Sequence, residues 1–171
     1  MCEITAEALG CSPDEVLVCS TGWIGYPLPM EAITTGIGRV ADSLNPAGGQ
    51  AAAEAIMTTD TVPKNTQVAG EGFTVGGLAK GAAMLEPNMA TMLAVLTTDA
   101  AVDPTTATGP LQGAAATSSN CLTVDGAEST TDTVLLPPSR RPDPTDPFLP
   151  APATPNPATA HPPHLTPPPP T

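Results

Sequence analysis

Residues 76–100, GGLAKGAAMLEPNMATMLAVLTTDA, contain the pattern that decides the fold. Within them, residues 89–98 form a short apolar run of strand length that is followed by Asp99. Just upstream, residues 66–79 alternate loosely and carry Val, Phe and Thr between glycines, which predicts strands joined by a turn. The segment therefore predicts strands on both sides of a loop that contains a lysine and a proline.

Helices are predicted on the N-terminal side of these strands. Composition and helix-end signals predict three helices: 2–10 ending at Gly10, 29–44 starting at a proline and interrupted by Gly36 and Gly38, and 48–57. Between the first two, residues 12–15 read as a turn, the apolar run 16–20 as a buried strand and residues 21–29 as a Gly- and Pro-rich loop.

On the C-terminal side, Gly109 and Pro110 weaken any helix between Asp103 and Ser119, and residues 122–136 predict a further pair of strands. Helices and strands that alternate in this way indicate an α/β fold, a layered α+β arrangement. The order of the strands stays open at this point.

Proline divides the chain into two regions. Fifteen of the 23 prolines fall in residues 137–171, so we expect one folded region, 1–136, and an extended, disordered tail. Two explanations of the tail are open: out-of-frame translation of a GC-rich gene, which we favour, and a genuine ligand for SH3- or WW-type grooves.

Charge and histidine content exclude several functions. The net charge is −12, and residues 1–136 hold 15 acidic but only three basic side chains, so nucleic acid is not an expected partner. His161 and His164 both lie in the proline-rich region. A Ser-His-Asp site, a Cys-His site and a zinc site using histidine are therefore excluded from residues 1–136.

No apolar run approaches the roughly 18 residues of a membrane span, so we expect a soluble cytoplasmic protein without a membrane partner. The four cysteines form no C-x-x-C pair and are too few for a disulfide scaffold. We expect four reduced thiols that serve as small core residues: Cys2, Cys11, Cys19 and Cys121.

Thr91 is a candidate nucleophile because it lies at the start of a predicted apolar strand, directly after the loop. With no histidine nearby, its base can be its own α-amine, provided that the preceding peptide bond is cut. The ordinary α-amine pKa of about 7.7 to 8.0 suits a base near neutrality. The alternative is that Thr91 is simply a strand residue.

Four segments together resemble the ornithine acetyltransferase family of arginine biosynthesis, also called glutamate N-acetyltransferase or ArgJ. They follow the family's order over nearly all of residues 1–136, and the PNMAT and TTDT words are the most diagnostic. The segments are STGWIGYPLPM (20–30), AIMTTDTVPK (55–64), GGLAKGAAMLEPNMATMLAVLTTDA (76–100) and LTVDGAESTTDTVLL (122–136).

The resemblance implies roles for individual residues. Family members cut themselves before the Thr of PNMAT, which implies cleavage between Ala90 and Thr91 and makes Thr91 the N-terminal nucleophile. Thr21 and Gly22 match the oxyanion hole, whose donors face the negative oxygen of a tetrahedral intermediate. Thr58 and Lys80 match positions that bind the amino-acid substrate. The alternative for the loop of Thr21 and Gly22 is an ordinary strand-ending turn, and the alternative for Lys80 is a solvated surface lysine.

The implied reaction is a ping-pong acetyl transfer. N-acetylornithine gives its acetyl group to Thr91, ornithine leaves, and glutamate takes the acetyl group from the ester. Some family members also accept acetyl-CoA, and no metal or bound organic cofactor is implied. The two self-cleavage products assemble as a heterotetramer in the family, so the resemblance implies the same fold and assembly here.

The chain also departs from the family pattern. Trp23, Ala82-Ala83 and the GAESTTD word replace the residues usual at those positions, and family chains are more than twice as long. We therefore expect an internal fragment that by itself is poorly folded and inactive.

Two other functions stay open at this stage. A self-cleaving aminopeptidase would also use an N-terminal nucleophile, although the TTDT and PNMAT words argue against it. The other alternative is a non-catalytic, proline-tailed acidic protein that binds partners.

Overall fold

The computed structural model describes residues 1–86, 91–127 and 131–137 of the 171-residue chain. Its elements are mixed α and β, as predicted. In chain order they are α1 (Cys2–Leu9), η1 (Pro13–Glu15), α2 (Met30–Asp42), α3 (Gly49–Ala55), β1 (Lys64–Ala69), β2 (Thr74–Lys80), β3 (Met92–Thr98), α4 (Pro104–Thr117), η2 (Ser119–Cys121) and β4 (Asp132–Leu135).

The strands form one sheet in the order β1-β2-β3-β4. β1 and β2 are a hairpin, β3 continues antiparallel to β2, and β4 adds in parallel to β3. The register pairs Lys80 at the end of β2 with Leu93 near the start of β3. The loop between β2 and β3 therefore leaves and re-enters the sheet at one end, which is where Thr91 lies.

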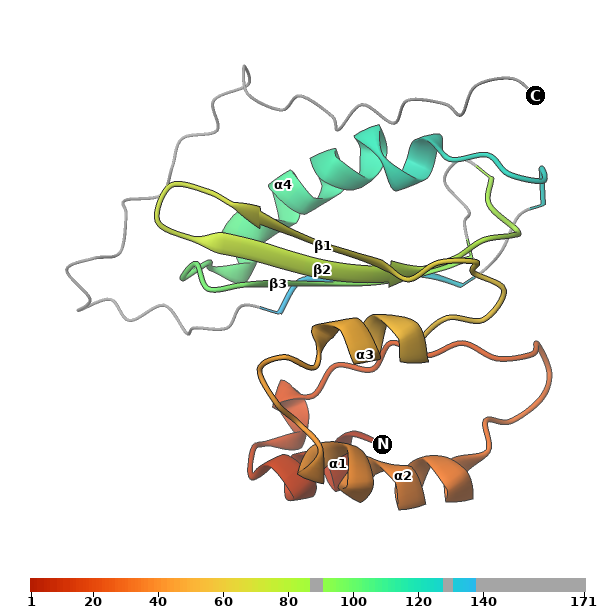
Figure 1. Cartoon of the computed structure of the whole chain (residues 1–171), viewed down its shortest axis with the longest axis vertical. Helices are drawn as coiled ribbons and strands as arrows, with labels where there is room; N and C mark the ends of the chain where they lie inside the picture. Colours follow the sequence, from red (N-terminus) through yellow and green to blue (C-terminus); the bar gives the residue numbers. More distant parts are fainter. Residues whose placement is uncertain (87–90, 128–130, 138–171) are drawn as a thin grey trace.

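Helices lie on both sides of the sheet, with α3 on one side and α4 on the other, while α1 and α2 pack together beyond α3 (Figure 1). A small apolar cluster occupies one sheet face: Leu85, Met92 and Ala94, with Ala79 and Val134 packed against it. Because side chains alternate along a strand, Lys80 and Leu93 lie on the opposite face, the side of α3.

Burial is sparse over the described residues. No large side chain among them is fully buried, and Ala53, which faces inward from α3, is the most buried apolar residue. In the loop between η1 and α2, Trp23 and Ile24 remain 82% and 87% exposed. Small residues bury little apolar area each, so this packing supplies only modest stabilisation.

For the described residues, the structure confirms three kinds of predicted element: the helices at 2–10, 29–44 and 48–57, the turn at 12–15, and the strands within 66–79 and 89–98. Gly10 ends α1 in the left-handed conformation, with φ of 70°. Two details of this region were wrong. α2 runs unbroken through Gly36 and Gly38. Residues 16–20 are not a buried strand: the segment has no regular secondary structure, pairs with no described strand and leaves Leu17 56% exposed.

The prediction against a helix at 103–119 was also wrong, because α4 spans this region despite Pro110. Two features outweigh the lost N–H of this proline. The Asp103 carboxylate accepts the Thr105 N–H at 2.8 Å as an N-terminal cap, and Pro104 occupies the first turn, where no N–H is needed. The alanine-rich second half then favours helix.

Residues 122–136 contain one described strand, β4, rather than a pair, and residues 124–126 form a bend. The cysteines, all of which are described, form no disulfide. None is a buried core residue, contrary to prediction: Cys11 and Cys121 are exposed, and Cys2 and Cys19 are half-buried. No helix in the described part of the chain is long and apolar enough to cross a membrane.

Candidate functional site

Asp60 is a buried carboxylate that joins three separate segments. One of its oxygens, Oδ1, accepts the Gly81 N–H at 2.9 Å and pairs with the Lys64 ammonium, and Oδ2 accepts the Thr58 N–H at 3.3 Å. Burial alone would raise the pKa of Asp60, but the hydrogen bonds from Lys64, Gly81 and Thr58 outweigh it and lower the pKa to about 2. The loop after α3 is thereby fixed to the end of β2.

Gly81 brings this junction against Thr91. Its φ is +148°, and a Cβ atom at this position would lie 2.7 Å from the Thr91 carbonyl oxygen. Only glycine allows so close an approach of the two chains. The end of β2 and the start of β3 are therefore in backbone contact at Gly81 and Thr91.

Thr91 itself has a fixed main chain and an unpaired side chain. Its N–H donates to the Met84 carbonyl at 2.8 Å. Its Oγ1 is buried and forms no hydrogen bond with the described residues. A buried hydroxyl without a hydrogen-bond partner costs free energy, so its presence in a folded chain calls for an explanation such as a role in catalysis.

Met84 lies in a turn that Asp125 holds. Met84 has a positive φ of 55°, unusual for a residue other than glycine. The Asp125 carboxylate accepts the N–H groups of Met84 at 2.9 Å and Leu85 at 3.3 Å, and the Val124 N–H donates to the Leu85 carbonyl at 2.9 Å. Hydrogen bonding from Met84, the largest influence, lowers the pKa of Asp125.

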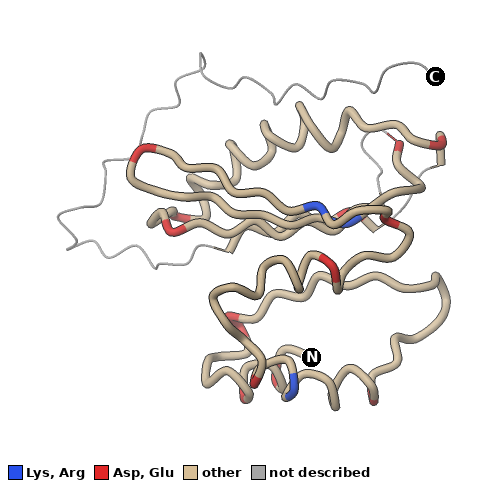
Figure 2. The backbone as a smooth tube through the Cα atoms, in the orientation of Figure 1, with Lys and Arg blue, Asp and Glu red and all other residues tan. Residues whose placement is uncertain are grey.

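Lys80 is buried, with 5% of its surface exposed, and forms no ion pair with a described residue. It lies close enough to Cys19 to influence that thiol: burial raises the pKa of Cys19, and the positive charge of Lys80 opposes the rise. Lys64 begins β1 and Lys80 ends β2, so both lysines lie at the end of the sheet nearest Thr91 (Figure 2). The lysines at this end of the sheet thus lie close to the carboxylate of Asp60, which pairs with Lys64.

The structure brings together three of the predicted site residues. The N–H of Thr58 and the N–H of Gly81, the residue after Lys80, both donate to Asp60, and Thr91 approaches Gly81 closely. Thr21 and Gly22 lie in the loop before α2, where Gly22 packs near Leu28, and no described contact joins them to Thr91. Ala90, the predicted residue on the other side of the cleavage point, lies outside the described residues.

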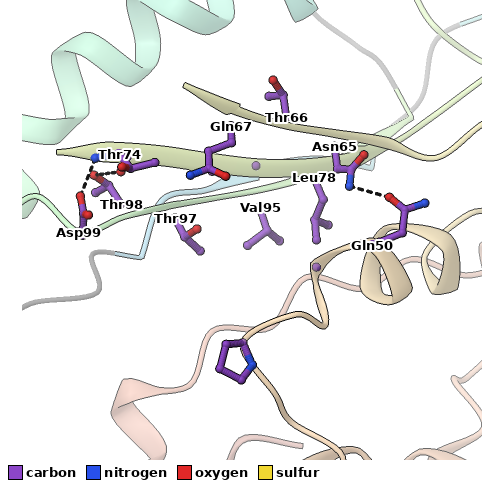
Figure 3. A pocket seen from close by; sticks show the side chains of 14 residues that line it. Gln50, Asn65, Thr66, Gln67, Thr74, Leu78, Val95, Thr97, Thr98 and Asp99 are labelled. Carbon is purple, nitrogen blue, oxygen red and sulfur yellow. Dashed lines mark hydrogen bonds between the residues drawn. The ribbon is translucent and has the colours of Figure 1, made fainter. Parts of the chain in front are cut away.

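A groove of about 670 Å³ runs along the sheet beside α3 (Figure 3). Uncharged polar side chains line much of it, and at one end the Asn65 amide donates to Gln50 at 2.9 Å. Leu78, which lines the groove, lies on the same face of β2 as Lys80. None of the predicted site residues lines this groove.

In the described part of the chain, no group of three or more His, Cys, Asp or Glu side chains is arranged to hold a metal ion. The site offers the hydroxyl of Thr91, the largely buried side chain of Lys80 and main-chain hydrogen bonds that fix the segments carrying them. These groups suit acyl transfer by a side-chain nucleophile.

Comparison with known proteins identifies the family of the chain. The model of the ArgJ family matches residues 1–148, most of the chain and twelve residues beyond the boundary predicted at 136. The chain belongs to the ArgJ family. Curated relatives called "Arginine biosynthesis bifunctional protein ArgJ" include those of Symbiobacterium thermophilum, 50% identical over 140 residues, and Geobacter sulfurreducens, 51% identical over 137 residues.

These two matches cover 80% and 78% of this chain but 35% of each relative. A third relative, from Mycolicibacterium paratuberculosis, is 53% identical over 125 residues, which is 71% of this chain and 31% of that protein. The chain therefore spans about a third of the length of the curated ArgJ relatives that it matches.

Sequence reasoning missed Asp60, Gly81, Met84 and Asp125 as parts of the site. Asp60 lies within the TTDT word and Asp125 within the LTVDGAESTTDTVLL segment, so the motifs contained both residues without indicating a role. Only the tertiary hydrogen bonds show that the two carboxylates hold the segments on either side of the β2–β3 loop.

Proposed function

We propose that this chain provides the nucleophile of an ArgJ acetyltransferase, which moves an acetyl group from N-acetylornithine to glutamate in arginine biosynthesis. The observation that carries the proposal is the state of Thr91 in a member of this family. Its hydroxyl is buried and unpartnered among the described residues, and it stands beside the segment that carries Lys80.

Self-cleavage would prepare the nucleophile. Thr91 Oγ1 attacks the Ala90 carbonyl carbon, the Ala90–Thr91 C–N bond breaks, and the hydroxyl proton passes to the Thr91 nitrogen. Water then hydrolyses the resulting ester, which leaves an Ala90 carboxyl group and a Thr91 with both a free hydroxyl and a free α-amine. That amine can act as a base near neutral pH.

Acetyl transfer would follow by two substitutions at the same hydroxyl. Thr91 Oγ1 attacks the acetyl carbon of N-acetylornithine, the amide C–N bond breaks, and the ornithine nitrogen takes the proton through the α-amine. The amine of glutamate then attacks the acetyl ester, its C–O bond breaks, and the proton returns to Oγ1. In this scheme Lys80 and Thr58 bind the amino-acid part of the substrate, and Thr21 with Gly22 stabilises the oxyanion.

The test uses a chimera, because the relatives are about three times as long as the matched segment. In this chimera, residues 1–136 of this chain replace the matching segment of the Symbiobacterium thermophilum relative. Intact mass and N-terminal sequencing follow cleavage, and exchange of acetyl between N-acetylornithine and labelled glutamate follows transfer. We expect fragments that begin at Thr91, together with acetyl exchange.

Two substitutions at Thr91 separate the outcomes. Thr91→Ala should abolish cleavage and transfer together, whereas Thr91→Ser keeps a hydroxyl and should retain part of each. Thr21→Ala should lower kcat more than it raises KM, by about 2.7 to 4 kcal/mol in transition-state stabilisation, because an oxyanion donor acts mainly in the transition state. Cleavage that persists in Thr91→Ala, or fragments that begin elsewhere, would remove Thr91 from this role.

Three further parts of the proposal rest on family membership. The cleavage products assemble as a heterotetramer, the enzyme works in the cytoplasm without a bound cofactor, and acetyl-CoA is a possible second donor of the acetyl group. Analytical ultracentrifugation of the cleaved chimera and a transfer assay with labelled acetyl-CoA test the assembly and the donor.

A further inference from the structure

We infer that Asp125 is a positioning residue for the Thr91 nitrogen, and that it acts through the carbonyl group of Met84. This inference rests on the proposed function, in which that nitrogen is first the amide of the bond to be cut and afterwards the catalytic amine. It assigns a role to two residues outside the predicted site.

The chain of contacts has two links. The Asp125 carboxylate accepts the Met84 N–H at 2.9 Å and the Leu85 N–H at 3.3 Å, from a position 41 residues away in sequence from Met84. The Met84 carbonyl in turn accepts the Thr91 N–H at 2.8 Å. Asp125 thus fixes the peptide groups on both sides of Met84. The second of these groups contains the Met84 carbonyl, which accepts the hydrogen bond from the Thr91 nitrogen.

The conformation of Met84 shows that the turn is held rather than relaxed. A φ of 55° disfavours most residues other than glycine, and the Met84 side chain is 47% exposed, so packing of that side chain is a weak reason for it. The Asp125 contacts offset the cost of this conformation. Without them, the turn would relax and its carbonyl would move away from Thr91.

Positioning this nitrogen matters before and after cleavage. As an amide, it belongs to the plane of the bond that Thr91 Oγ1 attacks, so holding it restricts the orientation of that bond. As an amine, it can donate one hydrogen to the Met84 carbonyl, which leaves its lone pair to accept the hydroxyl proton. Geometric errors of about 1 Å can cost a reaction about a hundredfold in rate.

The first test measures the rate of self-cleavage in the chimera. Asp125→Ala should slow cleavage at Thr91 by about tenfold to a hundredfold, and Asp125→Asn, which keeps one oxygen acceptor, should recover part of the rate. Asp99→Ala is the matched control, because Asp99 is also an acceptor, at 2.6 Å from the Thr74 N–H at the opposite end of β2. This control should cleave at the unaltered rate.

A pair of substitutions at Met84 tests the turn itself. Met84→Gly keeps the carbonyl and accepts a positive φ, so it should cleave faster than a variant whose side chain resists a positive φ. Met84→Val keeps the carbonyl but resists a positive φ, so it should be slowed as Asp125→Ala is. Equal rates in the two Met84 variants, or an unaltered rate in Asp125→Ala, would overturn the inference.

Hydrogen exchange separates failure of this inference from failure of the proposed function. In the uncleavable Thr91→Ala chimera, the amide of residue 91 should exchange slowly, and adding Asp125→Ala should speed its exchange by about tenfold or more. No change at this amide overturns the inference whether or not the chimera cleaves. Slow exchange that depends on Asp125, in a chimera that never cleaves at Thr91, contradicts the proposed function and leaves the contact between Met84 and Thr91 established.

Discussion

Gly81 faces the main-chain carbonyl of Thr91 so closely that a Cβ atom on Gly81 would lie 2.7 Å from the Thr91 oxygen. The same glycine donates its N–H to the buried Asp60 carboxylate at 2.9 Å. Gly81 is therefore the point where the TTDT loop and the candidate nucleophile meet. Its small size and its positive φ are both needed for this contact.

Gly81→Ala should therefore lower both the stability and the cleavage rate of the chimera. The added methyl group meets the Thr91 carbonyl, and the backbone conformation disfavours an L side chain, so we expect a loss of about 1 to 3 kcal/mol. Gly36→Ala is the control: it lies within α2 with open space around it and should raise stability slightly. Thermal midpoints and cleavage rates of the two variants check this, and equal behaviour would contradict it.

Asp60 predicts a specific dependence of stability on pH. Its pKa is about 2 in the folded chain, below the ordinary value of 3.8, so the ionised carboxylate stabilises the folded state by about 2 kcal/mol at neutral pH. This contribution is present above about pH 4 and is lost as the pH falls through 4 toward 2. Asp60→Asn should be less stable than the unaltered chimera at pH 7, and the difference should shrink toward pH 2. A difference in thermal midpoint that does not vary with pH would show that the charge of Asp60 is not the cause.

The strands of the sheet were predictable because alternation and apolar runs reflect which face is buried. The same signal failed at residues 16–20, because an apolar run does not tell whether a neighbouring strand exists to pair with it. The pattern of apolar residues also gives no indication of Asp60 and Asp125, which accept hydrogen bonds from main-chain groups 21 and 41 residues away. Motifs made Thr58, Lys80 and Thr91 candidates for the site, while the carboxylates that hold their segments depend on tertiary structure.

Pro110 gives a prediction about α4, where the sequence argument failed. A proline in a helix interior removes one backbone hydrogen bond and costs about 3 kcal/mol, and α4 keeps its helical form through its Asp103 cap and its alanines. Pro110→Ala should therefore slow hydrogen exchange in α4, and Asp103→Ala should speed it by removing a cap worth about 1 kcal/mol. Slower exchange in Asp103→Ala would contradict the capping argument.

Lys80 and Lys64 lie at the same end of the sheet and should respond in opposite ways to loss of charge. Lys80 is buried, so Lys80→Met replaces a buried charge with an apolar side chain of similar length and should leave the thermal midpoint of the chimera unchanged or higher. If Lys80 binds the substrate carboxylate, the same variant should raise KM for N-acetylornithine about tenfold or more.

Lys64→Met should show the reverse pattern, because it leaves the buried Asp60 carboxylate without its ammonium partner. Its thermal midpoint should fall, while KM changes little in the fraction that remains folded. Steady-state kinetics and thermal midpoints of both variants, measured side by side, separate the two roles. A large rise in KM for Lys64→Met with none for Lys80→Met would show that Lys64, and not Lys80, contacts the substrate. The reason is that a cation that touches the substrate changes KM directly, whereas a cation that only supports the fold changes the thermal midpoint.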